Sequence, residues 1–292
     1  MWLEPTRRIA FFKSMFRTLA LLAFLALPST AQACGGDTRC EVDGGYYLAS
    51  PPPDWDGTSP LPVVVFYHGW NSSPEGMFRN KVMIGAVHRR GAMFVAPWAR
   101  TGYWRQIGTG RAENGRDELA YAQAVLADLK RRWPVDANRV LASGFSRGAS
   151  MVWNLACYGD GLFTAFVPIA GGFWNSDPQT CPAGPVNLRH IHGTADRVVA
   201  YDEVGIYNSM PIPSGMELLR KINGCGTALA NSAETGARYT CQRWRGCSPG
   251  SALEICLHPG GHSIPAEWVA EGLDWMLSLE TATPTPDAAP SR

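Results

Sequence analysis

The sequence predicts an α/β fold with a mostly parallel sheet and helices on both of its faces. Short apolar runs that end near a glycine alternate with longer segments of three-four apolar spacing, and this alternation is typical of parallel strands joined by helices. The chain has 292 residues, of which 46% are hydrophobic and 17% charged. That composition allows a large buried core in a single α/β domain.

The first half of the chain begins the expected alternation of strands and helices. The run from Leu61 is apolar at every position up to Tyr67, which indicates a strand buried on both faces. Pro134 ends an amphipathic segment of helical spacing. In chain order we expect a strand at 45–50, a strand at 61–67, a helix over about 75–90, a strand at 92–98 and a helix over 116–133.

The second half continues the alternation and adds a hairpin. We expect strands at 139–145, 164–171 and 187–194, a helix from 147 through 157, a helix at 216–222, a hairpin of 238–244 with 252–259, and a final helix at 265–279. If Trp244 opposes Leu253 in the hairpin, Cys241 opposes Cys256, near enough for a cross-strand disulfide.

Both ends of the chain differ in composition from this region. Residues 1–33 have the layout of a secretory signal peptide, with a basic residue, an apolar core at Leu19–Leu27 and an Ala-Gln-Ala cleavage site. Met1 and Met15 are both possible starts for it. We therefore expect a catalytic domain at 34–280 and a disordered Pro/Thr/Ala-rich tail at 281–292.

Charge and cysteine content indicate the compartment and exclude some partners. Net charge is +1, and removal of residues 1–33, with four basic residues and Glu4, leaves 22 basic against 24 acidic residues. Nothing in this balance favours nucleic acid or a membrane as partner after signal cleavage. All eight cysteines follow residue 33, which predicts up to four disulfides in a secreted or periplasmic protein. Cys34 follows the cleavage site, but Ala31 stands where a lipoprotein signal has leucine, so lipid attachment is not favoured.

A serine between two glycines carries the chemical prediction. Gly144-Phe145-Ser146-Arg147-Gly148 matches G-x-S-x-G, with an expected strand before it and a helix after it. This is the context of the nucleophile elbow of the α/β-hydrolase fold, in which a sharp turn lifts the serine oxygen above the sheet. We therefore predict Ser146 as the nucleophile and the amide of Arg147 as one oxyanion donor.

A serine hydroxyl needs a histidine base and an acid that orients it. In this fold the acid and then the histidine follow the nucleophile along the chain. His262 lies in a Gly-Gly loop before the last helix, and Asp196 lies three residues beyond Gly193, where a strand ends. We predict a triad of Ser146, Asp196 and His262, with Asp202 as the second choice of acid.

The other histidines have plainer explanations. We expect His258 to pack near the rim of the site, His190 and His192 to be buried with hydrogen bonds to backbone, and His88 to lie on the surface. His68 is expected to be a buried histidine that supports the loop after its strand. No CxxC pair or metal cluster of known spacing is visible, so the sequence predicts no metal site.

The loop after the strand at 61–67 should supply the second oxyanion donor. Gly69 permits close backbone approach, so we predict that the amide of Trp70 donates and that its indole forms a wall of the acyl pocket. Trp98, Trp104 and Trp174 also follow expected strands. They are either an aromatic or carbohydrate platform or ordinary core residues, and the sequence leaves both alternatives open.

Taken together, these motifs resemble a known family. "YHGW", "GFSRGASM", "HGTADRVVAYD", "NGC", a later "GC" and "PGGHSIP" occur in the order found in secreted polyhydroxybutyrate depolymerase-like and feruloyl esterase-like α/β-hydrolases, over roughly Tyr46 to Leu279. The resemblance implies an ester hydrolase without cofactor, with the triad named above. It also implies a Cys225–Cys247 disulfide; with Cys241–Cys256, this leaves Cys34–Cys40 and Cys157–Cys181 as the remaining assignments.

The sequence departs from that family at two positions. Arg147 stands where a small or amide residue is usual, which places a cation near the site and makes acidic groups in the substrate more plausible. The tryptophan usual shortly after the histidine is missing after His262.

The functional prediction is a secreted serine carboxylic-ester hydrolase that works through an acyl-enzyme. The first expectation for its substrate is hydroxyalkanoate oligomers of the polyhydroxybutyrate type or related esters, and the alternative is feruloyl or acetyl esters of plant polysaccharide. Two rival functions are disfavoured. A serine peptidase of this fold would need a further acidic pair or domain. A non-catalytic binding protein on a hydrolase scaffold would be expected to lack a triad member.

Overall fold

The computed structural model describes residues 1–2, 34–105, 107, 115–174, 178, 180–231 and 238–280. The chain divides into two units, Met1–Ala33 and Cys34–Arg292, and the fold described below is that of the second. The expected signal peptide, apart from its first two residues, and the expected tail at 281–292 lie outside the described residues. Within the described ranges, no helix is both long enough and apolar enough to cross a bilayer.

In the part of the chain that the structure describes, one sheet of ten strands organises this unit. Its strands are β1 (Cys40–Val42), β2 (Gly45–Ser50), β3 (Leu61–Tyr67), β4 (Met93–Pro97), β5 (Val135–Phe145), β6 (Ala165–Ile169), β7 (Asn187–Gly193), β8 (Leu229–Asn231), β9 (Thr240–Trp244) and β10 (Ala252–His258). Their order across the sheet is β1-β2-β4-β3-β5-β6-β7-β10-β9-β8. The six strands from β4 to β10 in this order are parallel, and antiparallel strands flank them on both sides.

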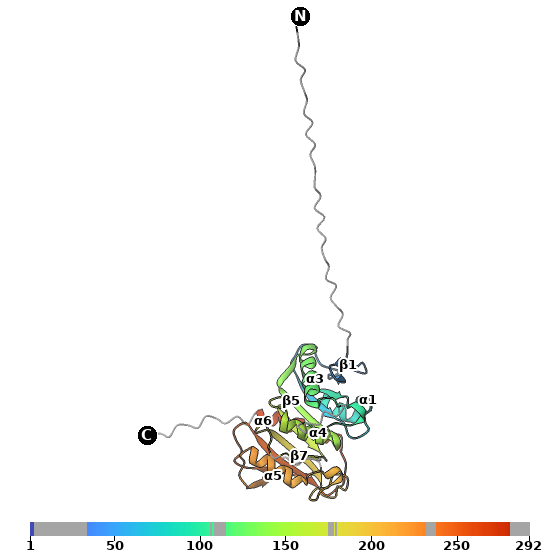
Figure 1. Ribbon diagram of the computed structural model, residues 1–292. Coiled ribbons are helices and arrows are strands. Elements are labelled where there is room, and N and C mark those ends of the chain that lie inside the picture. The colour runs from blue at the N-terminus through green and yellow to red at the C-terminus, as the bar shows by residue number, and fades with distance from the viewer. Residues whose placement is uncertain are drawn as a thin grey trace, which may run out of the picture. The chain divides into compact units, whose positions relative to one another are not determined.

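Helices cover both faces of the sheet (Figure 1). They are α1 (Pro74–Arg79), α2 (Lys81–His88), α3 (Glu118–Arg132), α4 (Arg147–Tyr158), α5 (Ile212–Ile222) and α6 (Glu267–Glu280), with short 3₁₀ turns η1 (Arg100–Gly102) and η2 (Ile206–Asn208). Helices α3, α4 and α5 pack in one apolar cluster with Val63 and Val65. Helices α1, α2 and α6 pack in a second cluster with Val64 and Phe66. Alternate residues of β3 therefore face opposite layers of helices. The mostly parallel sheet with helices on both faces confirms the predicted α/β-hydrolase fold.

The helix expected over 75–90 is wrong as a single element. Asn80 interrupts it, since its backbone (φ −80°, ψ 73°) is not helical and its side chain accepts a hydrogen bond from the Met83 amide. Asparagine is a preferred residue at a helix start, so the second helix begins here. Three further differences are the earlier start of α5, at Ile212, the earlier start of β5, at Val135 instead of 139, and the presence of the short strands β1 and β8.

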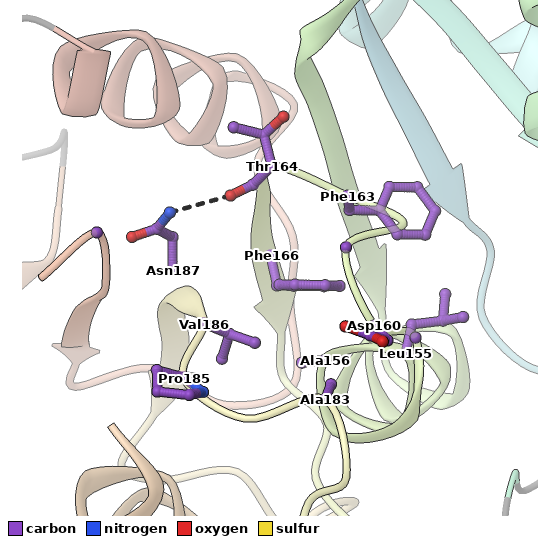
Figure 2. A pocket seen from close by; sticks show the side chains of 13 residues that line it. Leu155, Ala156, Asp160, Phe163, Thr164, Phe166, Ala183, Pro185, Val186 and Asn187 are labelled. Atoms are coloured by element: carbon purple, nitrogen blue, oxygen red, sulfur yellow. Dashed lines mark hydrogen bonds between the residues drawn. The ribbon is translucent and has the colours of Figure 1, made fainter. Parts of the chain in front are cut away.

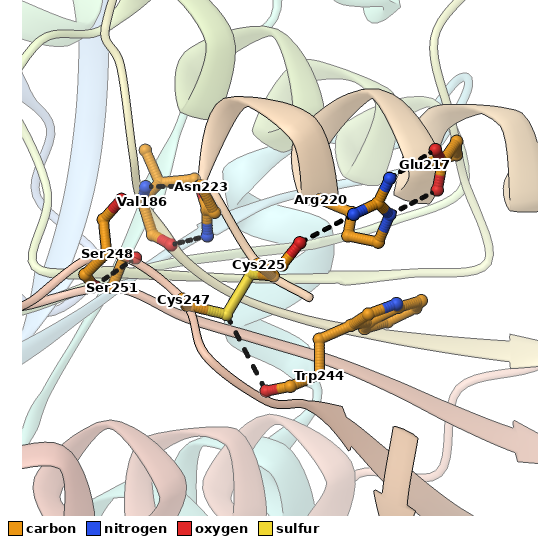
Figure 3. Close-up of a disulfide and its surroundings, with 9 residues drawn as sticks. All are labelled: Val186, Glu217, Arg220, Asn223, Cys225, Trp244, Cys247, Ser248 and Ser251. Carbon is orange, nitrogen blue, oxygen red and sulfur yellow. Dashed lines mark hydrogen bonds and ion pairs between the residues drawn. A yellow bond between two sulfur atoms is a disulfide. The ribbon is translucent and has the colours of Figure 1, made fainter. Parts of the chain in front are cut away.

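The hairpin of β9 and β10 has the expected register, with Cys256 opposite Cys241. The structure contains four disulfides, Cys34–Cys40, Cys157–Cys181, Cys225–Cys247 and Cys241–Cys256, which are the four pairs named from the sequence and the resemblance. Figure 3 shows the Cys225–Cys247 bond just beyond the end of α5. There Asn223 exchanges two hydrogen bonds with the backbone of Val186, and the disulfide thus lies beside a side-chain link between α5 and the start of β7.

Candidate active site

Ser146 occupies the sharp turn between β5 and α4. Its backbone (φ 56°, ψ −121°) is in a region that residues other than glycine rarely adopt. The Ser146 amide donates to the carbonyl of Ile169 at the end of β6 (3.0 Å), which fixes the turn against the neighbouring strand. The serine is thus held at the carboxyl end of the sheet, where ligands bind in open α/β folds.

The flanking glycines are required by close backbone approach. A Cβ at Gly148 would lie 1.8 Å from the carbonyl oxygen of Tyr67, and one at Gly144 would lie 2.7 Å from the carbonyl carbon of Gly148. No side chain fits at such distances, so the first turn of α4 can lie directly against the end of β3 only because both positions lack a Cβ.

Asp196 and His262 come from loops after two neighbouring strands and meet. β7 and β10 are paired in parallel, and their following loops bring the Nδ1 of His262 to 2.7 Å from the Oδ2 of Asp196. An ionised carboxylate only accepts hydrogen bonds, so Nδ1 carries the proton. This leaves Nε2 of His262 as the nitrogen able to accept one, as a general base requires.

The Asp196 carboxylate is buried and held from both sides. Its Oδ1 accepts hydrogen bonds from the amides of Val198 (2.8 Å) and Val199 (2.9 Å). Burial opposes its ionisation, but the hydrogen bond from His262 and those from the two amides outweigh it, and the pKa of Asp196 is lowered. The carboxylate is therefore ionised at neutral pH, as an orienting acid requires. Asp202, the second choice from sequence, is exposed.

The imidazole of His262 lies against the nucleophile turn. Its ring centroid is 4.7 Å from that of Phe145, the residue before Ser146. The structure thus places the Asp196–His262 pair beside the turn that carries Ser146. All three residues that the sequence predicted as a triad gather at one edge of the sheet, each in a loop or turn after a strand.

The loop after β3, residues 68–71, lies beside the same turn; we call it the oxyanion loop. A Cβ at Gly69 would be 3.6 Å from the Cβ of Ser146, so the backbone of this loop touches the turn. Arg147 directly follows Ser146 and is the first residue of α4. Both backbone positions predicted as oxyanion donors, Trp70 and Arg147, therefore flank Ser146 in the chain or in space.

Trp70 is half-exposed while the other loop tryptophans are more buried. The side chain of Trp70 is 57% exposed and stacks on Tyr103, with ring centroids 5.1 Å apart. Trp98 is half-buried and stacks on Tyr46. Trp104 and Trp174 are buried. The sequence left open whether these tryptophans form a ligand platform or belong to the core, and Trp104 and Trp174 belong to the core.

Arg147 does not extend freely from the site. Its Nε donates to the carbonyl of Trp104 (2.8 Å), and its guanidinium carbon lies 4.2 Å from the centre of the Trp174 ring. The side chain therefore bridges the loop after β4 and the loop after β6. This fixed position was not predicted from the sequence, because it depends on two loops that are distant along the chain.

The remaining histidines support the site from below or beside it. Nε2 of His192 donates to the carbonyl of Val199 (2.9 Å), so its Nδ1 accepts from Nε2 of His190 (2.9 Å). His192 thus has the expected backbone bond, and His190 donates to His192, a bond that the sequence did not predict. The alternate spacing of the two residues on one strand, which puts them on the same face, was the available signal. Burial lowers the pKa of both.

His68, His258 and His88 match their expected settings in most respects. His68 is fully buried and its Nδ1 donates to the carbonyl of Gly69 (2.9 Å); burial lowers its pKa. His258 is buried against Trp268, with ring centroids 4.8 Å apart. His88, expected at the surface, is half-buried and its Nε2 donates to the carbonyl of Ser50 (2.9 Å).

Two other features lie away from this edge. Among the described residues, the cluster whose spacing would suit a metal is Cys241, Glu254 and Cys256. The two cysteines are bonded to each other, and Glu254 is paired with Arg189 and Arg243, so the cluster has no ligand to spare. A pocket of about 150 Å³ is lined by residues of α4 and by the amino ends of β6 and β7 (Figure 2). It is lined by none of the predicted site residues.

Comparisons with known proteins agree with this fold and place the chain among esterase sequences. No protein-family model matches the chain. It is 25% identical over 262 residues to a probable feruloyl esterase C of Aspergillus niger, covering 83% of this chain and 88% of that protein. It is 27% identical over 273 residues to the protein of the same name from Aspergillus clavatus (85% and 92%). It is 25% identical over 287 residues to feruloyl esterase D of Neurospora crassa (86% and 90%).

Solved structures of the same fold include esterases. An acetyl xylan esterase from Aspergillus awamori superimposes with a TM-score of 0.58 at 13% identity, over 79% of this chain and 93% of that one. A thermostable esterase gives a TM-score of 0.53 at 18% identity, over 80% and 58%. At these identities the likeness concerns the fold alone. The chain thus has the α/β-hydrolase fold, and its sequence relatives, which are named feruloyl esterases, support a carboxylic ester hydrolase.

Proposed function

We propose that this protein is a serine esterase whose triad is Ser146, His262 and Asp196. The observation that carries the proposal is the 2.7 Å hydrogen bond between Asp196 and His262, beside a serine in the strained turn of a nucleophile elbow. Such a bond sets the tautomer of the imidazole and stabilises the imidazolium that forms during the reaction. A histidine held only for packing would not need an ionised, buried carboxylate on Nδ1.

The reaction follows from these positions. The Oγ of Ser146 attacks the ester carbonyl while Nε2 of His262 takes its proton, and the carbonyl oxygen becomes an oxyanion facing the amides of Trp70 and Arg147. The tetrahedral intermediate collapses to an acyl-enzyme as His262 returns the proton to the leaving alcohol. Water then attacks the acyl-enzyme with His262 again as base, and the carboxylic acid is released. No metal or organic cofactor is needed for these steps.

For the substrate, we propose feruloyl or acetyl esters linked to plant polysaccharide, rather than hydroxyalkanoate oligomers. The names of the relatives, feruloyl esterases C and D, favour this choice. It replaces the first expectation from sequence, polyhydroxybutyrate-type oligomers, with the alternative.

We also propose that the protein acts outside the cytoplasm. Four disulfides join all eight cysteines, and such bonds persist in oxidising compartments. The signal-like sequence at 1–33 supports the same location.

The test is hydrolysis of p-nitrophenyl acetate and butyrate by wild type and by Ser146→Ala. We expect the variant to lose about four to six orders of magnitude in kcat. Ser143→Ala is the matched control, since Ser143 lies on the same strand and its buried hydroxyl donates to the carbonyl of Val167; this variant should keep its activity.

Two further outcomes are informative. Methyl ferulate, acetylated xylan and hydroxybutyrate oligomers, compared by kcat/KM, decide the substrate class, and preference for the oligomers would contradict our choice. If wild type and Ser146→Ala are equally inert while folded and disulfide-bonded, the esterase proposal fails and a binding protein on a hydrolase scaffold becomes the better explanation.

A further inference from the structure

Two consecutive hydrogen bonds link the start of α4 to the oxyanion loop. The Nε of Arg147 donates to the carbonyl of Trp104 (2.8 Å), and the indole Nε1 of Trp104 donates to the carbonyl of His68 (2.8 Å). Arg147 directly follows Ser146, and His68 precedes Gly69 and Trp70. The chain of bonds therefore begins one residue from the nucleophile and ends two residues before the amide predicted to bind the oxyanion.

The segment that holds Trp104 contacts the oxyanion loop a second time. The amide of Asn71 donates to the carbonyl of Gly102 (2.9 Å). The loop is thus fixed at His68 on one side of Trp70 and at Asn71 on the other, both times by residues 102–104. A shift of that segment would move the Trp70 amide relative to Ser146.

The orientation of the Trp70 amide is set within the loop itself. The carbonyl of Gly69 accepts hydrogen bonds from Nδ1 of His68 (2.9 Å) and from the amide of Ser72 (3.3 Å). This carbonyl and the Trp70 N–H belong to one planar peptide group and point in opposite directions. Fixing the carbonyl therefore fixes the direction of the N–H.

Packing holds both members of the hydrogen-bonded chain in place. The Trp104 ring is buried and packs edge-on against Tyr67, with centroids 5.0 Å apart. The guanidinium of Arg147 lies over the Trp174 ring. A planar guanidinium can stack in this way and still donate in its own plane, which a lysine ammonium cannot reproduce.

We propose that Trp104 and the side chain of Arg147 are positioning residues that hold the oxyanion loop at a fixed distance from the nucleophile. The inference rests on the proposed esterase function and deepens it, because it assigns to Arg147 a role other than recognition of an acidic substrate group. Oxyanion donors held in advance stabilise the transition state more than the bound substrate. Loosening them should therefore lower kcat and leave KM nearly unchanged.

The first test is Trp104→Phe, which removes the indole N–H and keeps an aromatic ring. Deletion of a whole oxyanion donor costs about 10²–10³ in kcat, and a displaced donor should cost less, so we expect a loss of about 10- to 100-fold on p-nitrophenyl acetate. Trp275→Phe is the matched control, because Trp275 is also fully buried and its indole nitrogen has no hydrogen-bond partner among the described residues. It should lower Tm as Trp104→Phe does but leave kcat unchanged.

The second test acts on the other end of the chain of bonds. Arg147→Met keeps the backbone amide and a long side chain but removes the donor to Trp104, and it should lower kcat as Trp104→Phe does. Arg147→Lys retains a donor without the planar stack, and it should recover part of the loss on neutral esters. Should Trp104→Phe fail to fold, as judged by circular dichroism, the two Arg147 variants carry the test.

Inhibition by a trifluoromethyl ketone distinguishes a positioning role from a merely structural one. A substitution that only destabilises the fold should leave the inhibition constant of this compound unchanged. Ser146 Oγ adds to its carbonyl carbon, the proton passes to His262, and the former carbonyl oxygen becomes an oxyanion in the same place. The inhibition constant should rise in the variants by the factor by which kcat/KM falls.

Equal kcat in Trp104→Phe and Trp275→Phe, or an effect on KM alone, would overturn the inference, as would full activity in Arg147→Met. A selective loss in Arg147→Met and Arg147→Lys only on esters that carry a carboxylate would instead show that Arg147 binds an anion. Any of these outcomes overturns only the positioning role, and the proposed esterase function still stands if Ser146→Ala is inactive. Activity that survives in Ser146→Ala removes the proposed function itself.

Discussion

Two adjacent backbones at the nucleophile turn approach too closely for any side chain. Gly148 lies in the first turn of α4, and a Cβ there would lie 1.8 Å from the carbonyl oxygen of Tyr67 and 2.6 Å from that of His68. Its role is thus spatial, since α4 must contact the end of β3 for Ser146 and the oxyanion loop to be neighbours.

The Gly148→Ala variant should be destabilised, although alanine favours helix. We expect its free energy of unfolding to fall by about 1–3 kcal/mol, the usual range for overpacking, or the helix to shift and activity to be lost. Gly85→Ala is the control, because Gly85 lies within α2 and a Cβ there meets only the end of the Arg89 side chain at 3.6 Å. That change should stabilise by about 0.5–1 kcal/mol. Urea unfolding of both checks this, and equal effects would contradict it.

Single residues with a fixed chemical context could be predicted from sequence. Ser146 stands in a motif that includes its own local structure, and chain order narrows the choice of Asp196 and His262. The contacts of Trp104 and Arg147 could not be predicted, because they join residues 36 and 43 positions apart in sequence through loops without regular spacing. Tryptophan in such a loop carries no signal that separates a core residue from a ligand platform.

At the scale of elements, the site is assembled where parallel strands end. The loops or turns that follow β3, β5, β7 and β10 supply the oxyanion loop, Ser146, Asp196 and His262. Since these strands run in one direction, their carboxyl ends share one edge of the sheet. Ser146 and His262, which are 116 positions apart in sequence, are brought to the same edge of the sheet by the order of the strands.

The β9–β10 hairpin, whose second strand leads to His262, should depend on its disulfide. Replacing Cys241 and Cys256 together by serine opens a bridge with a sequence separation of 15, and loop entropy gives a loss of about 3 kcal/mol in the free energy of unfolding. The same change at Cys34 and Cys40, separated by 6 positions, should cost about 2 kcal/mol. Thermal unfolding under non-reducing conditions measures both, and a larger effect at the shorter bridge would contradict the expectation.

Elements with a regular apolar pattern were predictable, and their interruptions were less so. The register of the hairpin followed from pairing one tryptophan with one leucine, because a strand period of two leaves few alternatives. The break between α1 and α2 was missed, because the apolar spacing continues through it while Asn80 starts a new helix. β1 and β8, at three residues each, are too short for a pattern to show.

At the scale of the whole molecule, the interior holds charges and neutral histidines as well as apolar layers. Arg189 and Glu254 lie on neighbouring strands and form a buried ion pair with N–O distance 2.7 Å, and Arg243 adds a second cation. His190 and His192 form a hydrogen-bonded pair beneath the loop of Asp196. The charges of Glu254 and the two arginines compensate one another. The two histidines, by contrast, are buried in the neutral form.

Stability should therefore depend on pH through the buried histidines. Burial lowers the pKa of His190 and His192 in the folded protein, while in the unfolded chain they titrate near pH 6.5. The unfolded state thus binds more protons below about pH 6.5, so the free energy of unfolding is at its full value above that pH and falls as the pH is lowered. Each histidine contributes up to about 1.4 kcal/mol per pH unit.

The measurement is urea unfolding of wild type and His190→Phe between pH 7.5 and 5. The variant should show a shallower loss on acidification, by up to the contribution of one histidine. A slope unchanged by the substitution would mean that other groups carry the dependence.

Among the described residues, the strand at each edge of the sheet has three residues, β1 on one side and β8 on the other. A long open edge would offer a row of free amides and carbonyls to which a strand of another molecule can add, whereas a short edge offers few. The β1 edge is tied by Cys34–Cys40, and the strand inside β8 is tied to β10 by Cys241–Cys256. Short edge strands held in this way offer few free backbone groups to a second molecule, which disfavours the addition of strands from other copies of the chain.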